Sequence, residues 1–411
     1  MQLRLAAFGF LHKSSGSSAT ALFHVLQELV DRGHAVDFYH LPEMWKAEWL
    51  AGRENFRSLE VSDPVCMAIW GGINRLRPHV SPRIEQLLMT SFSQVANAVM
   101  FGRIKRRLRA AHRVNPYHAM LALNMLSPWR VPGLRVISWP QGPPLGESSF
   151  LAANARRLSG QLGRGYYAGL MAGYGLKYVQ YRSNVRKSDL IIGGSRWSVD
   201  GWRKFGVPAA KLAALPFPLG PEVLTLPVVR DSQSRSLLFL HIGRVVPRKR
   251  VDLLVRGFSE FRRDFPDARL LVVGRQDYGR DLEIMRADPL LSSGVEYRDA
   301  VPREDVARLI AAADCVVQTS ENENFGAAVA EALAAGRPVV VGPTNGTKDY
   351  LPPSCVVFSE YTPEAVAAGL LEIARRIQAA HVDLAAEARA AAKHHFNVAH
   401  VSDQFLELLL R

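Results

Sequence analysis

Cysteine is scarce in this sequence. The 411 residues contain three cysteines, Cys66, Cys315 and Cys355, and these lack the spacing of a metal site or of a disulfide framework. An odd number of scattered cysteines is typical of a reducing compartment. The sequence therefore excludes a disulfide-rich secreted scaffold. Because no cluster of metal ligands and no cofactor motif is visible, we expect neither a metal ion nor an organic cofactor.

Long apolar runs are also missing. No stretch reaches the roughly 18 consecutive apolar residues that a bilayer-spanning helix needs. Residues 1–10 form a short apolar run, which we interpret as a first strand and not as a signal peptide. We therefore expect a cytoplasmic protein. Peripheral attachment to the inner face of the membrane stays open as an alternative.

Acidic residues are few in the first half of the chain. Residues 1–225 hold 28 Lys and Arg against 13 Asp and Glu, whereas residues 226–411 hold 23 against 25. This asymmetry indicates that the first half faces an anionic partner. In residues 101–113, apolar side chains share one predicted helix face and basic side chains cover the other. An anionic membrane surface is one interpretation, and an ordinary solvated helix is the other.

The length of the chain favours two domains, and no internal repeat is present. Residues 3–10, the helical pattern that ends at Gly33, and the following run at 35–41 together predict a strand–helix–strand unit. A Ser/Gly loop containing Gly16 follows the first strand. Residues 218–236 are rich in proline and then polar, which fits a linker between domains.

A basic turn follows the first strand of the second half. The strand predicted at 237–242 leads into Gly243 and Arg244, and Lys249 lies five residues further on. Two cations beyond the end of a strand suit a diphosphate, because Arg offers a planar fork and Lys a point charge. A solvated turn is the alternative, since residues 248–250 are all basic.

Two glutamates lie in a strand–loop–helix–strand pattern at residues 316–341. Glu323 is in the polar loop, and Glu331 is eight residues later, inside an Ala-rich helix. The loop and the first turn of the helix contain the candidate binding residues Asn324, Phe325, Gly326 and Ala327. Open parallel sheets bind ligands at the carboxyl ends of their strands, and helix N-termini offer free N–H groups to anions or hydroxyls.

This arrangement resembles the donor-site signature of the family 4 retaining glycosyltransferases. The signature has Glu, seven residues and Glu, with Phe-Gly two residues after the first Glu and Gly-x-Pro-Val after the second. The pattern Gly-Arg, four residues, Lys at 243–249 extends the resemblance, which is specific over residues 236–376 and loose over 1–225. The resemblance implies the GT-B fold, an α/β architecture of two Rossmann-like domains facing a cleft.

The resemblance also implies a division of the chain. Residues 1–222 would form the acceptor-binding domain, residues 223–395 would bind the nucleotide sugar, and a helix at 396–411 would cross back to the first domain. The implied enzyme moves a hexose-type sugar from a nucleotide-diphosphate sugar to an acceptor hydroxyl, with retention of configuration and without a metal. Its setting would be the synthesis of a cell-envelope polysaccharide or glycolipid. The acceptor is unknown, and a lipid-linked acceptor stays open.

The implied catalytic residues are Glu323, which would contact the donor sugar, and the diphosphate-binding pair Arg244 and Lys249. Glu331 would contact the ribose. The remaining implied donor-binding residues are Asn324, Phe325, Gly326, Ala327, Gly243, Gly16, Asn345, Gly346 and Thr347.

Two positions depart from the family pattern. Arg250 replaces the glycine that follows the family's lysine. Gln141 lies where many members have a histidine, and an amide cannot accept a proton as an imidazole does. Other classes also stay open: an epimerase or phosphorylase of the same fold, or a non-catalytic protein that binds nucleotide sugars or nucleic acid. Nucleic acid is the weakest of these, because the tyrosines among the basic residues fit helical core positions better.

Overall fold

The computed structural model describes residues 2–9, 11, 17–40, 50, 52–62, 64–76, 79–80, 101–224, 236–277 and 281–411. The chain forms two compact units. Unit 1 contains Met1–Ser148, Arg164–Pro218 and Val398–Arg411, and unit 2 contains Ser149–Gly163 and Leu219–Asn397. The predicted loop at Gly16 and most of the predicted linker, residues 225–235, lie outside the described residues.

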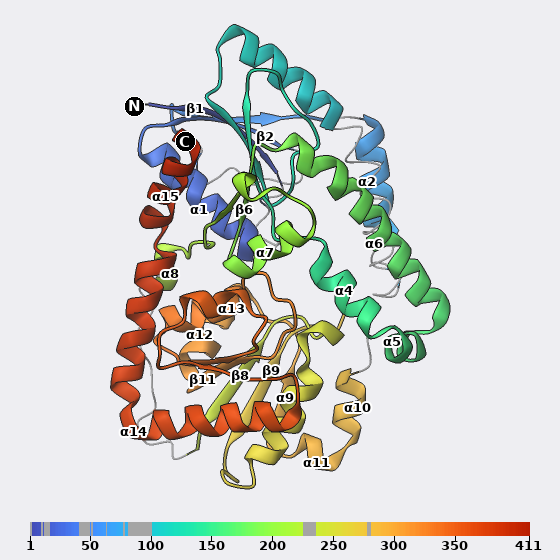
Figure 1. Ribbon diagram of the computed structural model, residues 1–411, viewed down its shortest axis with the longest axis vertical. Coiled ribbons are helices and arrows are strands. Elements are labelled where there is room, and N and C mark those ends of the chain that lie inside the picture. The colour runs from blue at the N-terminus through green and yellow to red at the C-terminus, as the bar shows by residue number, and fades with distance from the viewer. Residues whose placement is uncertain are drawn as a thin grey trace. The chain divides into compact units, whose positions relative to one another are not determined.

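Unit 1 is built on a parallel sheet flanked by helices (Figure 1). Among the described residues its strand order is β3-β2-β1-β4-β5-β6-β7. Ala7 of β1 lies opposite Phe38 of β2 and Leu121 of β4. The strands are β1 (Arg4–Gly9), β2 (Ala35–His40), β3 (Phe56–Glu60), β4 (Ala119–Leu123), β5 (Arg135–Trp139), β6 (Leu190–Gly193) and β7 (Leu212–Ala214). The central strands are apolar and buried, because helices cover both faces of a parallel sheet.

The helices of unit 1 follow the strands in alternation. They are α1 (Ser17–Asp31), α2 (Pro64–Leu76), the beginning of α4 (Leu145–Ala153), α6 (Arg164–Asn184), α7 (Arg196–Lys204) and α15 (Val398–Leu410). Residues 101–114 are also helical. Helix α15 packs within unit 1, where Asp403 binds Arg32 of α1 at 2.5 Å and Phe405 stacks on Trp139. The last helix of the chain is therefore part of the first unit.

Unit 2 has a second parallel sheet, with the order β10-β9-β8-β11-β12-β13 in its described residues. Its strands are β8 (Leu238–Ile242), β9 (Arg269–Val273), β10 (Val295–Arg298), β11 (Cys315–Gln318), β12 (Val339–Val341) and β13 (Val356–Val357). Its helices are α5 (Ala155–Leu162), α8 (Pro221–Leu224), α9 (Val251–Phe261), α10 (Asp281–Ala287), α11 (Pro289–Ser292), α12 (Arg303–Ala312), α13 (Ala327–Ala334) and α14 (Pro363–Phe396). The strand order reverses between β8 and β11, which is where such sheets bind ligands.

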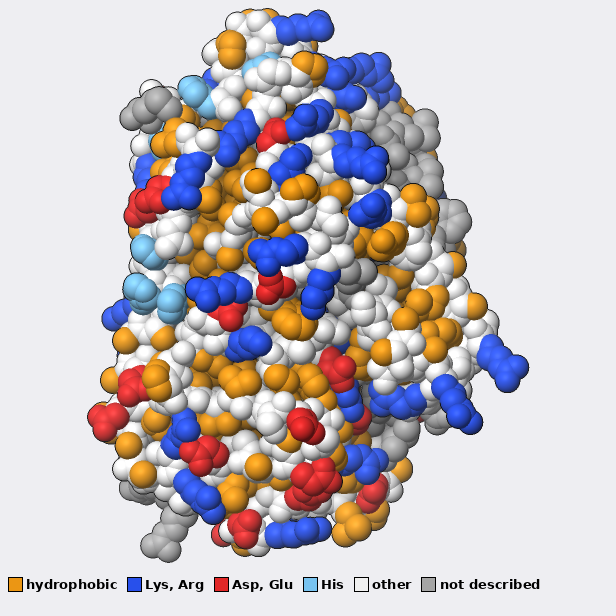
Figure 2. All heavy atoms as spheres, viewed as in Figure 1, with side chains coloured by type: hydrophobic (Ala, Val, Ile, Leu, Met, Phe, Trp, Pro, Cys, Tyr) orange, Lys and Arg blue, Asp and Glu red, His pale blue; other side chains and the backbone are white. Residues whose placement is uncertain are grey.

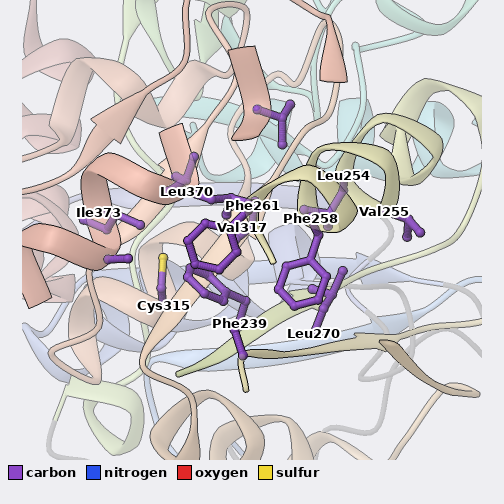
Figure 3. Close-up of a cluster of buried hydrophobic side chains, with 14 of the residues drawn as sticks. Phe239, Leu254, Val255, Phe258, Phe261, Leu270, Cys315, Val317, Leu370 and Ile373 are labelled. Carbon is purple, nitrogen blue, oxygen red and sulfur yellow. The ribbon is translucent and has the colours of Figure 1, made fainter. Parts of the chain in front are cut away.

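The core of unit 2 lies between this sheet and the helices α9 and α14. Figure 3 shows Phe239 of β8 against Phe258 and Phe261 of α9, with Leu370 and Ile373 of α14 beside them. Helix α9 approaches α14 closely at Gly257, where a Cβ atom would come within 2.7 Å of the Pro363 carbonyl oxygen. This packing fixes the direction of β8, whose carboxyl end carries Gly243 and Arg244.

The predicted α/β class with two Rossmann-like units is confirmed. Strand β3 was missed in the sequence, because its side chains are mostly exposed and its pattern is polar. The expected first domain at 1–222 and unit 1 differ in three segments, because residues 149–163 and 219–222 belong to unit 2 and Val398–Arg411 belongs to unit 1. Residues Ser149–Gly163 pack with unit 2, where Arg157 lies 3.6 Å from Asp252 of α9.

Candidate functional site

The candidate site lies at the carboxyl ends of β8 and β11, on either side of the strand-order reversal. The turn after β8 includes the short 3-10 helix η5 (Pro247–Lys249), and the loop after β11 runs over residues 319–326. The two segments are joined by backbone hydrogen bonds, because Glu321 N–H donates to the Arg248 carbonyl at 2.9 Å. Thr319 Oγ1 donates to the carbonyl of Lys249 at 3.0 Å.

A third segment, residues 342–347 after β12, holds Glu323 from the other side. Glu323 N–H donates to the Thr344 carbonyl at 3.1 Å, and the Glu323 carbonyl accepts from Gly346 N–H at 2.8 Å. Glu323 and Asn345 thereby form an isolated parallel bridge. The backbone of Glu323 is consequently fixed on both sides, although the residue lies in a loop.

The Glu323 carboxylate is held by two cations. Its Oε2 atom contacts Lys249 Nζ, and Arg248 Nη1 lies 3.4 Å away. Burial by itself would raise the pKa of Glu323, but Lys249 and Arg248 outweigh burial and lower this pKa to about 2. Glu323 is therefore an ionised hydrogen-bond acceptor at any physiological pH. Lys249 was predicted to belong to this site, whereas Arg248 was set aside as part of a basic turn.

His241 of β8 lies in the interior below this cluster. Its Nδ1 atom lies 3.2 Å from the Val317 carbonyl, and its side chain is fully buried. Burial and the charge of Lys249 lower the pKa of His241 to about 4. The imidazole is therefore neutral at neutral pH, and it adds no charge to the site.

Arg244 follows β8 and binds Asp277, which follows the neighbouring strand β9. Its Nη1 atom donates to Asp277 at 2.9 Å, and Asp277 also accepts from Arg275 at 2.8 Å. Asp277 is buried, whereas the side chains of Arg244 and Arg275 are 54% and 57% exposed. The buried carboxylate thus holds two arginines that keep much of their surface open to solvent. Neither Asp277 nor Arg275 was singled out in the sequence.

The start of α13 depends on Gly326, which has φ 84°. A Cβ atom at this position would lie 2.7 Å from Gln318 Oε1 and 2.9 Å from Asn345 Oδ1, so only glycine fits.

Phe325 is buried and packs edge-on against Phe396 at 5.7 Å. Phe325 therefore anchors the loop with its side chain. The backbone contacts to a ligand that we predicted for Asn324, Phe325, Gly326 and Ala327 stay predictions. Gly243 is also open to an approaching ligand, because a Cβ atom there would meet nothing within 4 Å.

Asn345 and Thr347 bind protein groups in this structure. Asn345 donates to Gln318 Oε1 at 3.0 Å, and its Oδ1 atom accepts from the N–H and the hydroxyl of Thr347. Gly346 N–H is bound to Glu323, as described above. These donors hold the loop that supports Glu323. Direct contact with a donor molecule stays a prediction.

Glu331 is buried in α13 and binds Arg303. Arg303 Nη2 donates to Glu331 Oε1 at 2.6 Å, from the first residue of α12. Burial raises the pKa of Glu331, and Arg303 offsets only part of this rise. The two glutamates therefore have opposite environments, since one has a lowered pKa and the other a raised pKa. No sequence signal pointed to Arg303, which lies 28 residues before its partner.

Arg250, at the position where the family pattern has glycine, has φ 50° in the left-handed region. Its guanidinium contacts Glu321 and lies 3.2 Å from Asp252. Gln141 is exposed in the bend after β5.

Among the described residues, no group of three His, Cys, Asp or Glu side chains could hold a metal ion. No helix in the same part of the chain is long and apolar enough to cross a membrane.

Solved structures share this fold along the whole chain. The complex of Anabaena HepE with UDP and glucose aligns with a TM-score of 0.64 at 15% identity and covers 100% of both chains. Sucrose-phosphate synthase from Thermosynechococcus elongatus aligns with a TM-score of 0.65 at 17% identity, covering 99% of this chain and 98% of the other. The fold is that of the GT-B glycosyltransferases, as predicted.

The second half of the chain is similar in sequence to known glycosyltransferases. Residues 226–391 match the family "Glycosyl transferases group 1". A mannosyltransferase of Mycolicibacterium smegmatis, the GDP-mannose-dependent alpha-(1-6)-phosphatidylinositol monomannoside mannosyltransferase, is 32% identical over 39% of this chain and 46% of its own length.

A plant protein gives a second match. A phosphatidylinositol N-acetylglucosaminyltransferase subunit of Arabidopsis thaliana is 30% identical over 39% of this chain and 35% of its own length. The chain thus matches less than half the length of both curated relatives.

Proposed function

We propose that this protein is a glycosyltransferase that moves a sugar from a nucleotide-diphosphate sugar to an acceptor hydroxyl, with retention of configuration. One observation carries the proposal: the ionised Glu323 is fixed beside Lys249 and Arg248 at the strand-order reversal. A carboxylate in this state accepts hydrogen bonds from sugar hydroxyls, and the cations beside it attract a diphosphate. The family of residues 226–391 supports the same activity.

Each predicted site residue has a role in this proposal. Glu323 would accept hydrogen bonds from the donor sugar, and Glu331 would bind the ribose. The bond between the sugar and the diphosphate breaks as the bond to the acceptor oxygen forms, and the proton of the acceptor hydroxyl passes to the departing diphosphate. Negative charge then grows on the diphosphate, where Arg244 and Lys249 would stabilise it without a metal ion. The exposure of Arg244 leaves its guanidinium accessible to such a ligand.

The acceptor that we propose is a lipid-linked hydroxyl at an anionic membrane surface. Both curated relatives are named for reactions on phosphatidylinositol compounds. The excess of basic residues in 1–225 suits a surface of anionic lipid headgroups. The protein would then work in the cytoplasm, attached peripherally to the inner face of the membrane, in glycolipid or polysaccharide synthesis.

A transfer assay tests the proposal. Purified protein is incubated with a panel of nucleotide sugars and lipid-linked acceptors, with EDTA present, and the anomeric configuration of the product is determined by NMR. We expect transfer with retention in the presence of EDTA. Changing Arg244 and Lys249 together to Ala should lower kcat by at least about 10²-fold, because transition-state charge loses its partners. Glu360→Gln, at an exposed carboxylate, is the matched control.

Three results would contradict parts of this proposal. Binding of nucleotide sugars without transfer or hydrolysis would make the protein a non-catalytic binder. A strict need for a divalent metal would exclude the metal-free mechanism, and a product of inverted configuration would exclude retention.

A further inference from the structure

Helix α6 has an unusual surface for a helix of a water-soluble domain. It has 21 residues, of which Leu170, Gly173 and Asn184 are buried. Within a single turn it exposes Leu176 and Val179, which are 51% and 65% accessible. Tyr178 lies between them in sequence and is 43% accessible, but its ring packs edge-on against Phe205 at 5.0 Å. Figure 2 shows apolar side chains gathered over this helix, on the right of the view. Exposed apolar side chains that gather in this way mark an interaction surface.

The charge around this turn has one sign. Residues 164–188 contain five Lys and Arg and no Asp or Glu. On α6, Lys177 lies between the exposed apolar side chains in sequence, and Arg164 is exposed at the start of the helix. Arg186 is exposed just beyond the end of the helix, in η3 (Val185–Lys187). Such a surface complements a negatively charged partner.

The basic helix at 101–114 belongs to the same unit and lies near the end of α6. Burial and the charge of Lys105 together lower the pKa of Lys187, which places the two basic segments within electrostatic reach. The apolar face of this helix is in the core, since Phe101, Ile104 and Leu108 are buried. This helix therefore supplies exposed charge, and α6 supplies the exposed apolar turn.

We propose that α6 docks on an anionic lipid bilayer, with Leu176 and Val179 entering the headgroup region and the surrounding cations binding lipid phosphates. Apolar side chains combined with basic residues and no acidic ones are what interfacial membrane helices present. The occupant is a lipid surface because the charged residues of 164–188 are all positive. A second copy of the chain would bring the same positive charge against it.

This inference deepens the proposed function, because it names the surface that would bring the enzyme to a lipid-linked acceptor. The full chain is sedimented with vesicles of phosphatidylcholine, or with vesicles in which part of this lipid is replaced by phosphatidylglycerol. No donor is added. We expect binding to the anionic vesicles only, and release when salt screens the charges.

The decisive variant is Leu176→Ser with Val179→Ser, which changes two exposed side chains. The vesicle-bound fraction should fall about tenfold, because the apolar contribution to interfacial binding is lost. The matched control is Leu290→Ser with Val382→Ser, at side chains of the same types in unit 2 that are 78% and 79% exposed. The control should bind vesicles like the unchanged protein. Both variants should keep the affinity for the nucleoside diphosphate.

Several outcomes would overturn the inference. The unchanged protein could ignore anionic vesicles at low salt, or the α6 variant could bind as well as the control. If the α6 variant instead lost self-association in analytical ultracentrifugation, a second copy would be the occupant. Because no donor is present, failure of the proposed sugar transfer would leave the vesicle result unchanged, and the two proposals can fail separately.

Discussion

Glu323 shows how a buried carboxylate can stay ionised. Its side chain is 14% exposed, and burial of this kind normally raises a carboxyl pKa. Lys249 and Arg248 reverse the shift and lower the pKa from 4.5 to about 2. A group whose pKa is lowered on folding adds stability above its unfolded pKa, and this contribution is lost as the pH falls through the folded pKa.

The first prediction compares the unchanged protein with Glu323→Gln between pH 6 and pH 2. At pH 6 the variant should unfold with a free energy lower by about 3 kcal/mol, since the paired carboxylate is gone. The difference should shrink as the pH falls from 4.5 toward 2. Urea unfolding at each pH measures it. A difference that does not depend on pH would mean that Glu323 does not carry the shifted titration.

Glu331 leads to a second prediction. It is buried and bound to Arg303, and its proposed partner is a ribose that takes no part in bond breaking. Glu331→Gln should therefore weaken binding of the nucleoside diphosphate about tenfold, or about 1.4 kcal/mol, and change kcat much less. Calorimetry and steady-state kinetics measure the two effects. Unchanged affinity would argue against the ribose assignment.

At the scale of elements, the site depends on how the turn after β8 is tied to the loop after β11. Backbone hydrogen bonds join Arg248 to Glu321, and the Arg250 side chain reaches Glu321 as well. A glycine at position 250 would adopt the left-handed backbone more easily, but it would lose the contacts with Glu321 and Asp252. At position 250 this chain therefore has an arginine that forms ion pairs with Glu321 and Asp252, in place of a glycine that would adopt the left-handed backbone more easily.

The third prediction is a double-mutant cycle on Arg250→Gln and Glu321→Gln. The coupling free energy of the pair should be about 1 kcal/mol, because the two side chains are largely buried. Each single variant should also lower kcat more than it raises KM, since the pair positions Lys249 and Glu323. The Arg308–Asp305 pair is the matched control, because both of its side chains are exposed. A coupling no larger than that of the control would remove the positioning role.

At the scale of the whole molecule, charge is divided between the two halves of the chain. The first half is strongly basic, and the second half is nearly neutral. The helix at 101–114 directs several of its basic side chains to solvent, although Arg103 donates to the Ser62 carbonyl and Arg107 to the Glu60 carbonyl. These charges would add long-range attraction to a membrane without inserting into it.

The fourth prediction changes Arg103, Lys105, Arg106 and Arg107 together to Ser. Binding to anionic vesicles should fall about tenfold or more, because each Lys or Arg near such a surface adds about 1 kcal/mol. The salt dependence of binding should weaken as well. Affinity for the nucleoside diphosphate, measured by calorimetry, should stay the same. Vesicle binding that is unaffected by the variant would show that this helix does not face the membrane.

The sequence by itself determined the α/β alternation and the main candidate residues of unit 2. Short apolar runs alternate with helical patterns, and loop residues follow the strands, so Arg244, Lys249 and Glu323 could be placed at strand ends. These features are local, because they depend on residues within a few positions of one another. Periodicity also predicted the helix at 101–113 with its apolar and basic faces.

Only the tertiary structure decided which partners these residues have. Arg303 reaches Glu331 and Asp277 holds Arg244 because the sheet order places distant strand ends side by side. Packing likewise decided which apolar side chains are covered. The apolar face of the helix at 101–114 lies in the core, whereas α6, whose pattern is weakly amphipathic, leaves Leu176 and Val179 exposed. A pattern along the chain states which residues share a face, but the neighbouring elements determine whether that face is covered.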